Sequence, residues 1–374
     1  APKARAAITT TTTAKPTTTV APTSTTAAPA PTTTVAPTTT TTVAPTTTTT
    51  APAPAPTTLL GMRYQNPTDP YTIANVNLWQ GKRTAVSTVF RKTNFPIADL
   101  VTKLKEVWYG GAVPVYSIDI IDSNAFIAGG GLDPRLDAIG AALTTFLAGP
   151  DGVYGNADDR RIFLRPAWEA NGNWYAWSPC TATGGPASDY RAMFRRIHDR
   201  FTLAGMDSRD SAWIFSVNQA DWPTNTCAME DLYPGDAYVD WLGLDAYTRS
   251  AYDSPEVAFT PMVNRLRALA PGKPVSVNEA GVSSRVKVGK SAYVTSYFKW
   301  VADNDIRMVA WFNNDNTNGD WTVYGGTLGD ESILGALTST LAWSSYRVAV
   351  SDPRYVGSSL TNPRLLTDAQ FMGR

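Results

Sequence analysis

Residues 161–177 read RIFLRPAWEANGNWYAW, and the apolar run at the start of this stretch decides the fold class. Its continuous apolar character suits a strand that is covered on both faces, as strands of parallel sheets are. Seven similar runs occur along the chain. The eight strand candidates are residues 58–64, 83–90, 112–120, 161–167, 211–218, 238–247, 273–280 and 307–314.

Amphipathic stretches separate these runs. In residues 97–108, five apolar side chains recur at helical spacing and form one stripe, which predicts a helix. The other helix candidates are residues 133–149, 188–205, 254–270, 291–304 and 331–350. The expected helix boundaries are Ser188 and Ser254 as N-caps, and Gly149, Gly205 and Gly272 just past helix ends.

Eight strands with intervening helices predict a (β/α)8 TIM barrel, an α/β fold, over residues 58–350. A doubly wound open sheet is the alternative, but no glycine-rich phosphate loop follows the first strand. Residues 65–82 show a poor helical pattern, and the stretch after Asn218 is short. Residues 351–374 form a C-terminal extension whose role the sequence does not indicate.

Residues 1–57 consist almost entirely of Thr, Pro, Ala and Val. Such a segment cannot bury apolar surface, so we expect a disordered linker with extended, proline-rich geometry. An O-glycosylated stalk and an unmodified spacer both fit this pattern, and either could join the barrel to another module or to the cell surface. The start at Ala1 rather than Met fits the removal of a signal peptide.

Charge and composition exclude several function classes. The chain has 32 Lys+Arg and 32 Asp+Glu, and Lys3, Arg5 and Lys15 are the charges of the linker, so the remainder is nearly neutral. A nucleic-acid partner would need a basic face, and no apolar run approaches a membrane span. The single histidine, His198, lies on a helical pattern, which argues against Ser-His-Asp, Cys-His and histidine-rich metal sites.

Two glutamates stand where a barrel carries its chemistry, at the C-terminal ends of strands. Glu169 follows the fourth strand candidate and Glu279 ends the seventh, and these strand ends face each other across the barrel mouth. Most glycoside hydrolases use two carboxylates that flank the scissile bond. A separation of about 5–5.5 Å between the two carboxyl groups gives retention of the anomeric configuration. The alternative is that each glutamate only pairs with Arg165 or another barrel arginine. The two-carboxylate chemistry requires no metal and no cofactor.

The same segments resemble glycoside hydrolase family 26, the β-mannanase-like branch of the clan of retaining (β/α)8 glycosidases. That family carries Arg-x-x-His-Glu-Met-Asn-Gly-x-Trp-x-x-Trp at strand four. The corresponding residues here are Arg165, Trp168, Glu169, Ala170, Asn171, Gly172, Trp174 and Trp177. The resemblance covers about residues 95–345 and implies that Glu169 is the acid/base and Glu279, beside Gly281, the nucleophile. Trp168 replaces the family histidine and Ala170 the methionine, which leaves the sugar specificity open.

Aromatic and polar residues near the expected strand ends are candidates for sugar binding, because flat C–H faces of sugars stack on rings. Each ring is otherwise a core or loop anchor. The substrate-binding candidates are Arg165, Trp168, Asn171, Trp174, Trp177, Asn218, Trp222, Asp245, Tyr247 and Trp311, with Tyr175 and Trp321 as further rings. Tyr247 is placed to hydrogen-bond the nucleophile. The rings expected in the core are Trp108, Trp213, Trp241 and Trp343.

Cys180 and Cys227 are the only cysteines, and the predicted barrel puts them on neighbouring loops. A disulfide is the preferred interpretation over two buried thiols, and with it secretion into an oxidising compartment. Residues 149–161 read GPDGVYGNADDRR, where Asp151, Asp158 and Asp159 could suggest calcium. Their spacing lacks the ligand ladder of an EF-hand and favours a tight acidic turn.

The sequence therefore predicts a secreted retaining endo-β-glycosidase that acts on a polysaccharide. The resemblance makes β-1,4-mannan the first substrate to expect, while a mixed-linkage β-glucan or a xylan would use the same machinery. Two alternatives from other classes are a non-catalytic carbohydrate-binding barrel and a scaffold protein displayed on its stalk.

Overall fold

The computed structural model describes residues 56–64, 72–223, 227–249, 254–333 and 340–374. The predicted linker lies almost wholly outside the described residues. The chain divides into two units, Ala1–Ala53 and Pro54–Arg374, and the fold belongs to the second.

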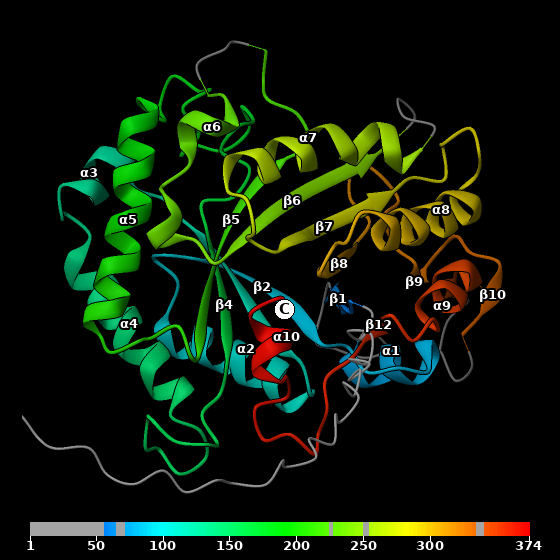
Figure 1. The fold of residues 1–374 in the computed structure, drawn as a ribbon, viewed down its shortest axis with the longest axis horizontal. Coiled ribbons are helices and arrows are strands. Elements are labelled where there is room, and N and C mark those ends of the chain that lie inside the picture. Colours follow the sequence, from blue (N-terminus) through cyan, green and yellow to red (C-terminus); the bar gives the residue numbers. More distant parts are fainter. Residues whose placement is uncertain (1–55, 65–71, 224–226, 250–253, 334–339) are drawn as a thin grey trace, which may run out of the picture. The chain divides into compact units, whose positions relative to one another are not determined.

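The described residues form a closed barrel of eight parallel strands, each hydrogen-bonded to the next along the chain (Figure 1). The barrel strands are β1 (Thr58–Tyr64), β2 (Val86–Lys92), β3 (Val113–Asp119), β4 (Ile162–Pro166), β5 (Ser211–Asn218), β6 (Trp241–Thr248), β7 (Val275–Val282) and β8 (Met308–Asn313). Strand β1 closes the barrel against β8 in a register that runs from Leu59–Met308 to Tyr64–Asn313. This pairing confirms the TIM barrel and excludes the open sheet.

Helices lie between the strands, as the amphipathic stretches predict. The larger ones are α2 (Ile97–Tyr109), α4 (Asp133–Leu147), α5 (Ala187–Leu203), α7 (Pro255–Leu269) and α8 (Lys290–Asp303). Short helices are α3 (Asn124–Ala128), α6 (Met229–Leu232) and a 3-10 turn at Asp236–Tyr238. The side chain of Ser254 accepts the amide of Val257, so it is the N-cap that the sequence predicts.

The helix boundaries differ from the prediction at one N-cap. Helix α5 begins at Ala187 after Pro186, so Ser188 lies inside its first turn instead of capping it. Proline favours a helix start because its fixed φ suits the entry and its missing N–H is not needed there. Gly149, Gly205 and Gly272 all have positive φ just past helix ends, where glycine adopts the left-handed conformation without a Cβ clash.

Two segments differ from their predicted structure. Residues 73–80, in the stretch with a poor helical pattern, form helix α1 (Ile73–Gln80), which Thr72 caps and left-handed Gly81 ends. The predicted helix 331–350 is a helix only at α9 (Ser344–Val350). Its first part contains β10 (Glu331–Ser332) and β11 (Leu341–Ala342), which join β9 (Tyr324–Gly326) in a small antiparallel sheet. Antiparallel pairing of β11 with both β10 and β9 overrides the local helical periodicity.

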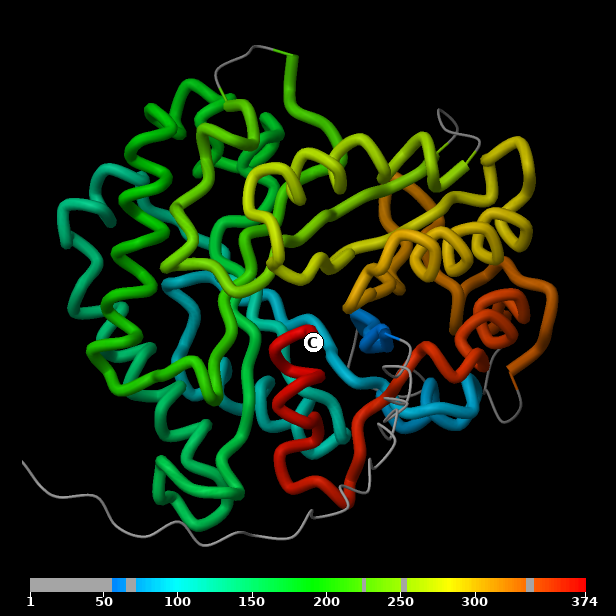
Figure 2. The backbone as a smooth tube through the Cα atoms, viewed as in Figure 1, coloured from blue at the N-terminus to red at the C-terminus, as the bar shows by residue number. Residues whose placement is uncertain are grey.

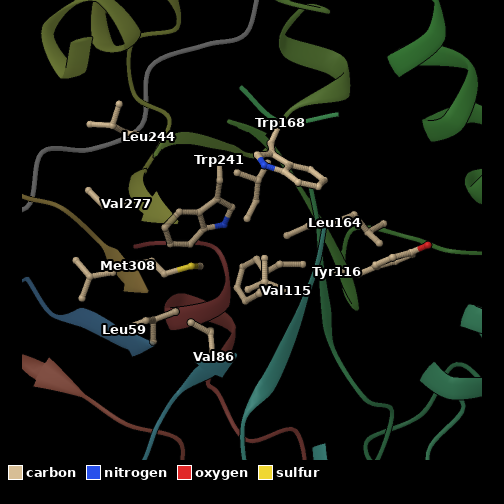
Figure 3. Packing of buried hydrophobic residues seen from close by; sticks show 14 of the residues in the cluster. Leu59, Val86, Val115, Tyr116, Leu164, Trp168, Trp241, Leu244, Val277 and Met308 are labelled. Carbon is tan, nitrogen blue, oxygen red and sulfur yellow. The ribbon is translucent and has the colours of Figure 1, made fainter. Parts of the chain in front are cut away.

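The core fills the barrel and the space between strands and helices. Figure 3 shows Leu59, Val86 and Met308, from three different strands, gathered near the indole of Trp241. Trp108, Trp213 and Trp241 are buried, as expected for core rings. The indole of Trp343 is only partly buried and packs against this core.

The C-terminal extension covers the N-terminal end of the barrel strands. Strand β12 (Tyr355–Val356) pairs in parallel with the start of β1, and helix α10 (Asp368–Phe371) follows it. The Phe371 ring lies 4.8 Å from that of Phe163 in β4, and Trp241 Nε1 donates to the Phe371 carbonyl over 3.1 Å. Figure 2 shows this segment in red, with the end of the chain marked C. The C-terminal end of the strands is the one left open for a site.

Candidate active site

The chain leaves β4 through two residues in the left-handed conformation. Ala167 has φ 46° and Glu169 has φ 53°, a conformation that costs a non-glycine residue about 1–3 kcal/mol. Main-chain hydrogen bonds hold both, from the Ala167 amide to Ile118 (3.0 Å) and from the Glu169 amide to Ser216 (2.9 Å). As a result the consecutive side chains of Trp168 and Glu169 both line one cavity. Such strain, maintained by its surroundings, is characteristic of functional sites.

A β-bulge in β7 positions the second glutamate. The β6–β7 pairing runs from Leu244–Val277 directly to Asp245–Glu279, so Asn278 is an extra residue in β7. The Asn278 amide points into the barrel, where it donates to Ser216 Oγ over 3.1 Å. Glu279, the next residue, lines the cavity at the barrel mouth. The bulge therefore redirects a side chain that regular alternation would send to the other face.

The two glutamates share a cavity of about 620 Å³ at the C-terminal ends of the strands. Its lining residues are Arg63, Phe90, Trp168, Glu169, Trp174, Tyr175, Asn218, Gln219, Tyr247, Arg249, Glu279, Phe312, Asn316, Asn318 and Trp321. The set consists of rings, amide or guanidinium donors and the two glutamates, which is the composition expected of a site for a polyhydroxylated ligand.

Two donors hold the carboxylate of Glu279. Arg165 Nη2 lies 2.5 Å from Oε1, and the Tyr247 hydroxyl donates to Oε2 over 2.5 Å. Gly281 makes room for this tyrosine, since a Cβ there would lie 2.8 Å from the Tyr247 ring. Each carboxylate oxygen thus has a donor of its own, which fixes the orientation of the group at the cavity wall.

Arg165 is the buried centre of the charge network below the cavity. Its Nη1 donates to both carboxylate oxygens of Asp245, over 2.8 and 2.9 Å, and its Nε to Ser117 Oγ over 2.8 Å. Burial lowers the pKa of Arg165, but the charges of Asp245 and Glu279 outweigh it and raise the pKa above the ordinary arginine value. One guanidinium therefore orients Glu279 and balances two carboxylates.

Glu169 has a different environment. Its Oε1 accepts from Asn218 Nδ2 over 3.0 Å and its Oε2 from Trp174 Nε1 over 2.7 Å. Burial, reinforced by the negative charge of Glu279, raises the pKa of Glu169 to about 7, although both hydrogen bonds act in the opposite direction. At neutral pH a substantial fraction of Glu169 carries a proton that it can donate. This is the property that a general acid needs.

The structure brings four of the substrate-binding candidates to the cavity wall, namely Trp168, Trp174, Asn218 and Tyr247. Arg165 and Asp245 lie beneath it, completely buried, and reach the cavity only through Glu279.

The other four candidates lie outside the cavity lining. The side chain of Asn171 holds the main chain of Asn218. Its Oδ1 accepts from the main-chain amide of Asn218 over 2.8 Å, and its Nδ2 donates to the main-chain carbonyl over 3.1 Å. Trp177 donates to the Trp168 carbonyl over 2.9 Å, and Trp311 to the Trp321 carbonyl over 2.8 Å, so both buried indoles support residues that do line the cavity. Trp222, whose amide donates to the Asn171 carbonyl, is 38% exposed.

Several lining residues were not among the sequence candidates: Arg63, Phe90, Gln219, Arg249, Phe312, Asn316 and Asn318. Arg63 is the next-to-last residue of β1, and its guanidinium lies 4.5 Å from the centre of the Phe312 ring and 5.1 Å from that of Phe90. The signal that found the glutamates, a charged residue at the end of an apolar strand, also applies to Arg63 in TLLGMRY. The two asparagines follow β8 in a loop whose path the sequence does not indicate.

Cys180 and Cys227 form the predicted disulfide, with 5.3 Å between their Cα atoms. It links the loop after β4, which carries Trp174, to the loop after β5, the strand that ends at Asn218. In the acidic turn, Asp151 accepts the Val153 amide and Asp159 the amides of Gly155 and Asn156.

Metal ligands and membrane-spanning helices are two further features to consider in the described ranges. Nowhere in them do three His, Cys, Asp or Glu side chains gather as a metal site would require. The helices described there are all too short or too polar to span a membrane.

Comparisons with known proteins agree with this geometry. Residues 151–317 match the family model of glycosyl hydrolase family 26. A 172-residue stretch is 31% identical to endoglucanase H of Acetivibrio thermocellus and covers 44% of this chain and 19% of that protein. A 95-residue stretch is 32% identical to a mannan endo-1,4-beta-mannosidase of Bacillus subtilis and covers 24% of each chain. The matched segments thus span about a fifth to a quarter of the length of these curated relatives.

Among solved structures, a modular endo-beta-1,4-mannanase from Cellulomonas fimi superimposes with a TM-score of 0.57. The two are 18% identical, and the match covers 84% of this chain and 73% of that one. At this identity the similarity concerns the fold, which is the same barrel. Taken with the match of residues 151–317, which contain β4 to β8, to the family model, it agrees with the resemblance seen in the sequence: this part of the chain is similar to glycosyl hydrolase family 26.

Proposed function

We propose that this chain is a retaining endo-β-glycosidase that hydrolyses a β-linked polysaccharide. The first candidate for this polysaccharide is β-1,4-mannan. The observation that supports this is the pair of glutamates in one cavity with opposite environments. Glu279 is held by two strong donors, whereas burial raises the pKa of Glu169 to about 7. Two carboxyl groups whose environments differ in this way divide into an acid and a nucleophile.

In the first half of the proposed reaction, a Glu279 oxygen attacks the anomeric carbon while Glu169 gives its proton to the departing glycosidic oxygen. The bond to the leaving sugar breaks and a glycosyl ester of Glu279 forms. In the second half, Glu169 takes a proton from water, and that water displaces Glu279 from the anomeric carbon. Two inversions give net retention of configuration.

Electrostatics couple the two halves. The negative charge of Glu279 contributes to the raised pKa of Glu169. When Glu279 becomes an uncharged ester, this contribution disappears, and the pKa of Glu169 falls toward the value that suits a base. The same side chain can then act as an acid in one step and as a base in the next.

The choice of mannan rests on the relatives whose names include mannan endo-1,4-beta-mannosidase. A β-glucan is the second candidate, because the longest matched stretch is shared with a protein named endoglucanase H. Trp168 adds to this alternative. Its indole occupies the wall beside Glu169, donates to the Tyr175 hydroxyl over 3.1 Å, and presents a larger and more apolar ring than the imidazole of the family motif.

Release of reducing ends from mannan, mixed-linkage β-glucan, xylan and arabinan tests the proposal. Product anomers are followed by proton NMR in the first minutes of the reaction. We expect reducing ends from at least one of the β-glycans and initial formation of the β-anomer. Initial formation of the α-anomer would contradict retention. Sugar binding without any reducing ends would favour the non-catalytic carbohydrate-binding barrel.

We also propose that the protein is secreted and that residues 1–57 act as a spacer to another module or to a surface. The Cys180–Cys227 disulfide supports an oxidising compartment, and the Thr/Pro composition supports an extended tether. Mass spectrometry of the protein purified from its natural source would show hexose increments on the threonines if the spacer is O-glycosylated.

A further inference from the structure

Lys290 occupies a position that is unfavourable for a positive charge. It is the first residue of α8, where the helix dipole is positive, and only 2% of its surface is exposed. Its ammonium donates to two main-chain carbonyls, those of Asp320 and Thr322, the latter over 3.0 Å. A buried lysine at a helix N-terminus must be compensated by such contacts.

The two carbonyls that Lys290 binds flank Trp321, a wall of the cavity. The carbonyl of Trp321 itself accepts from Trp311 Nε1 over 2.8 Å. Three successive carbonyls are therefore held by buried side chains, and two of the three depend on a single ammonium group.

This loop supports the nucleophile. The Trp321 ring lies 5.0 Å from the ring of Tyr247, whose hydroxyl donates to Glu279 over 2.5 Å. The guanidinium of Arg249, another lining residue, lies 5.6 Å from the Trp321 ring. A shift of Trp321 would thus change the shape of the wall and the support of Tyr247 together.

We propose that Lys290 is a positioning residue: its charged ammonium fixes the Trp321 wall of the cleft and thereby sets the affinity for the glycan. This inference rests on the proposed function and deepens it, because it assigns control of substrate binding to a residue that does not contact the cavity.

The charge of Lys290 makes this support dependent on pH. Burial lowers the pKa of Lys290 to about 8, against the opposing effect of Asp320 and Asp315 in the bound loop. Asp330, which accepts from Ser291 and Ser344, is the carboxylate on the α9 side. The ring of Trp343 lies 5.6 Å from the ammonium. Below pH 8 the ammonium is charged and its bonds to the carbonyls are strongest, and above pH 8 it becomes a weaker neutral donor.

The first test compares wild type with Lys290→Gln, using steady-state kinetics on the best glycan of the panel. At pH 6.5 we expect KM to rise about 5- to 10-fold, with kcat within about 2-fold, because binding changes more than chemistry. Wild-type KM should rise above pH 8, and the KM of the variant should not. Lys299→Gln is the matched control, since Lys299 lies on the same helix with its side chain 74% exposed. An unchanged KM in Lys290→Gln, or the same KM change in the control, would overturn the proposal.

A double-mutant cycle separates positioning from a general loss of structure. If Lys290 acts through the indole, then Lys290→Gln should raise KM less than about 2-fold in a Trp321→Ala background. Independent, multiplicative effects would contradict the proposed route.

A spectroscopic readout keeps the inference testable when no glycan is cleaved or when Lys290→Gln does not fold. The near-UV circular dichroism of Trp321 is taken as the difference between wild type and Trp321→Phe. We expect this difference to change between pH 7 and 9.5 with a midpoint near 8. A difference spectrum that is constant over this range would overturn the positioning role, while the absence of reducing ends alone would count only against the proposed function.

Discussion

Two arginines of the same strand region, four positions apart, show how the two ends of the barrel differ. Arg161, just before β4, is buried at the N-terminal end, where its Nη1 donates to the Leu366 carbonyl over 2.7 Å and its guanidinium lies 4.8 Å from the Phe371 ring. Arg165, in β4 and equally buried, binds Asp245 and Glu279 at the C-terminal end. The residue type and the burial are the same, but the partners are not.

The difference lies in what covers each end. At the N-terminal end, the C-terminal extension supplies backbone carbonyls, a ring and the carboxylate of Asp368, so the barrel is closed by its own chain. At the other end, the partners of Arg165 are side chains of the barrel, and above them a cavity of about 620 Å³ remains. Buried charge therefore supports the structure at one end and is part of a site at the other, and the partners and the open space above them distinguish the two ends.

Removal of the nucleophile should give the largest effect at the open end. Glu279→Gln keeps the shape of the side chain and an acceptor for Tyr247, but an amide cannot form the glycosyl ester. We expect kcat to fall by on the order of 10⁴-fold or more. The variant should unfold at nearly the same denaturant concentration as wild type, and near wild-type turnover would show that Glu279 is not the nucleophile.

Glu169→Gln should lower kcat/KM on the polysaccharide by about 10² to 10⁴-fold, because no proton reaches the leaving oxygen. In wild type, kcat/KM should decrease above pH 7, since the acid must be protonated and its pKa is about 7. An aryl glycoside with a good leaving group needs little protonation, so its first step should be much less affected. Equal losses on both substrates would argue against an acid role.

At the closed end, Phe371→Ala should affect stability and leave catalysis unchanged. Phe371 is 1% exposed and packs on Phe163, so its loss creates a cavity that costs about 3 kcal/mol of unfolding free energy. Urea denaturation measures the cost, and kcat/KM of the remaining folded protein should stay within about 2-fold. A large kinetic defect would mean that the two ends of the barrel are coupled.

The smallest effect is expected from Trp174→Phe, which keeps a ring but removes the indole N–H that Glu169 Oε2 accepts. That hydrogen bond favours the charged carboxylate, so its loss, worth about 1 kcal/mol, should raise the pKa of Glu169. The alkaline limb of the kcat/KM profile should move upward by about 0.5 to 1 pH unit. A downward movement would contradict the sign of this contact.

Much of the barrel was predictable because its signals are local. Runs such as AVPVYSIDI are continuous in the chain, and each of the eight predicted strands overlaps an observed one. Failures occurred where strand pairing or capping residues, and not the spacing of apolar residues, decide the structure. The stretch 331–350 has a helical pattern, yet Leu341–Ala342 within it pairs with both Glu331–Ser332 and Tyr324–Gly326. Helix α1 has a weak amphipathic pattern, and Thr72 and Gly81 define its ends.

Within the candidate site, the sequence indicated the acidic and aromatic residues of the motif, but the contacts that each of them makes depend on the tertiary structure. Trp174 and Trp177 lie three residues apart, and one reaches Glu169 while the other is buried under Trp168. Lys290 follows an ordinary loop and begins an ordinary amphipathic helix. Nothing local distinguishes it from an exposed lysine such as Lys299.

The sequence by itself determined the alternation of strands and helices, the two strand-end glutamates and the single possible disulfide, because these follow from composition, periodicity and count. The tertiary structure alone decided which end of the barrel is covered, which rings line the cavity, and how burial and a neighbouring charge raise the pKa of Glu169. Those properties arise from through-space contacts among segments more than a hundred residues apart, such as Arg165 and Glu279, and no local pattern encodes them.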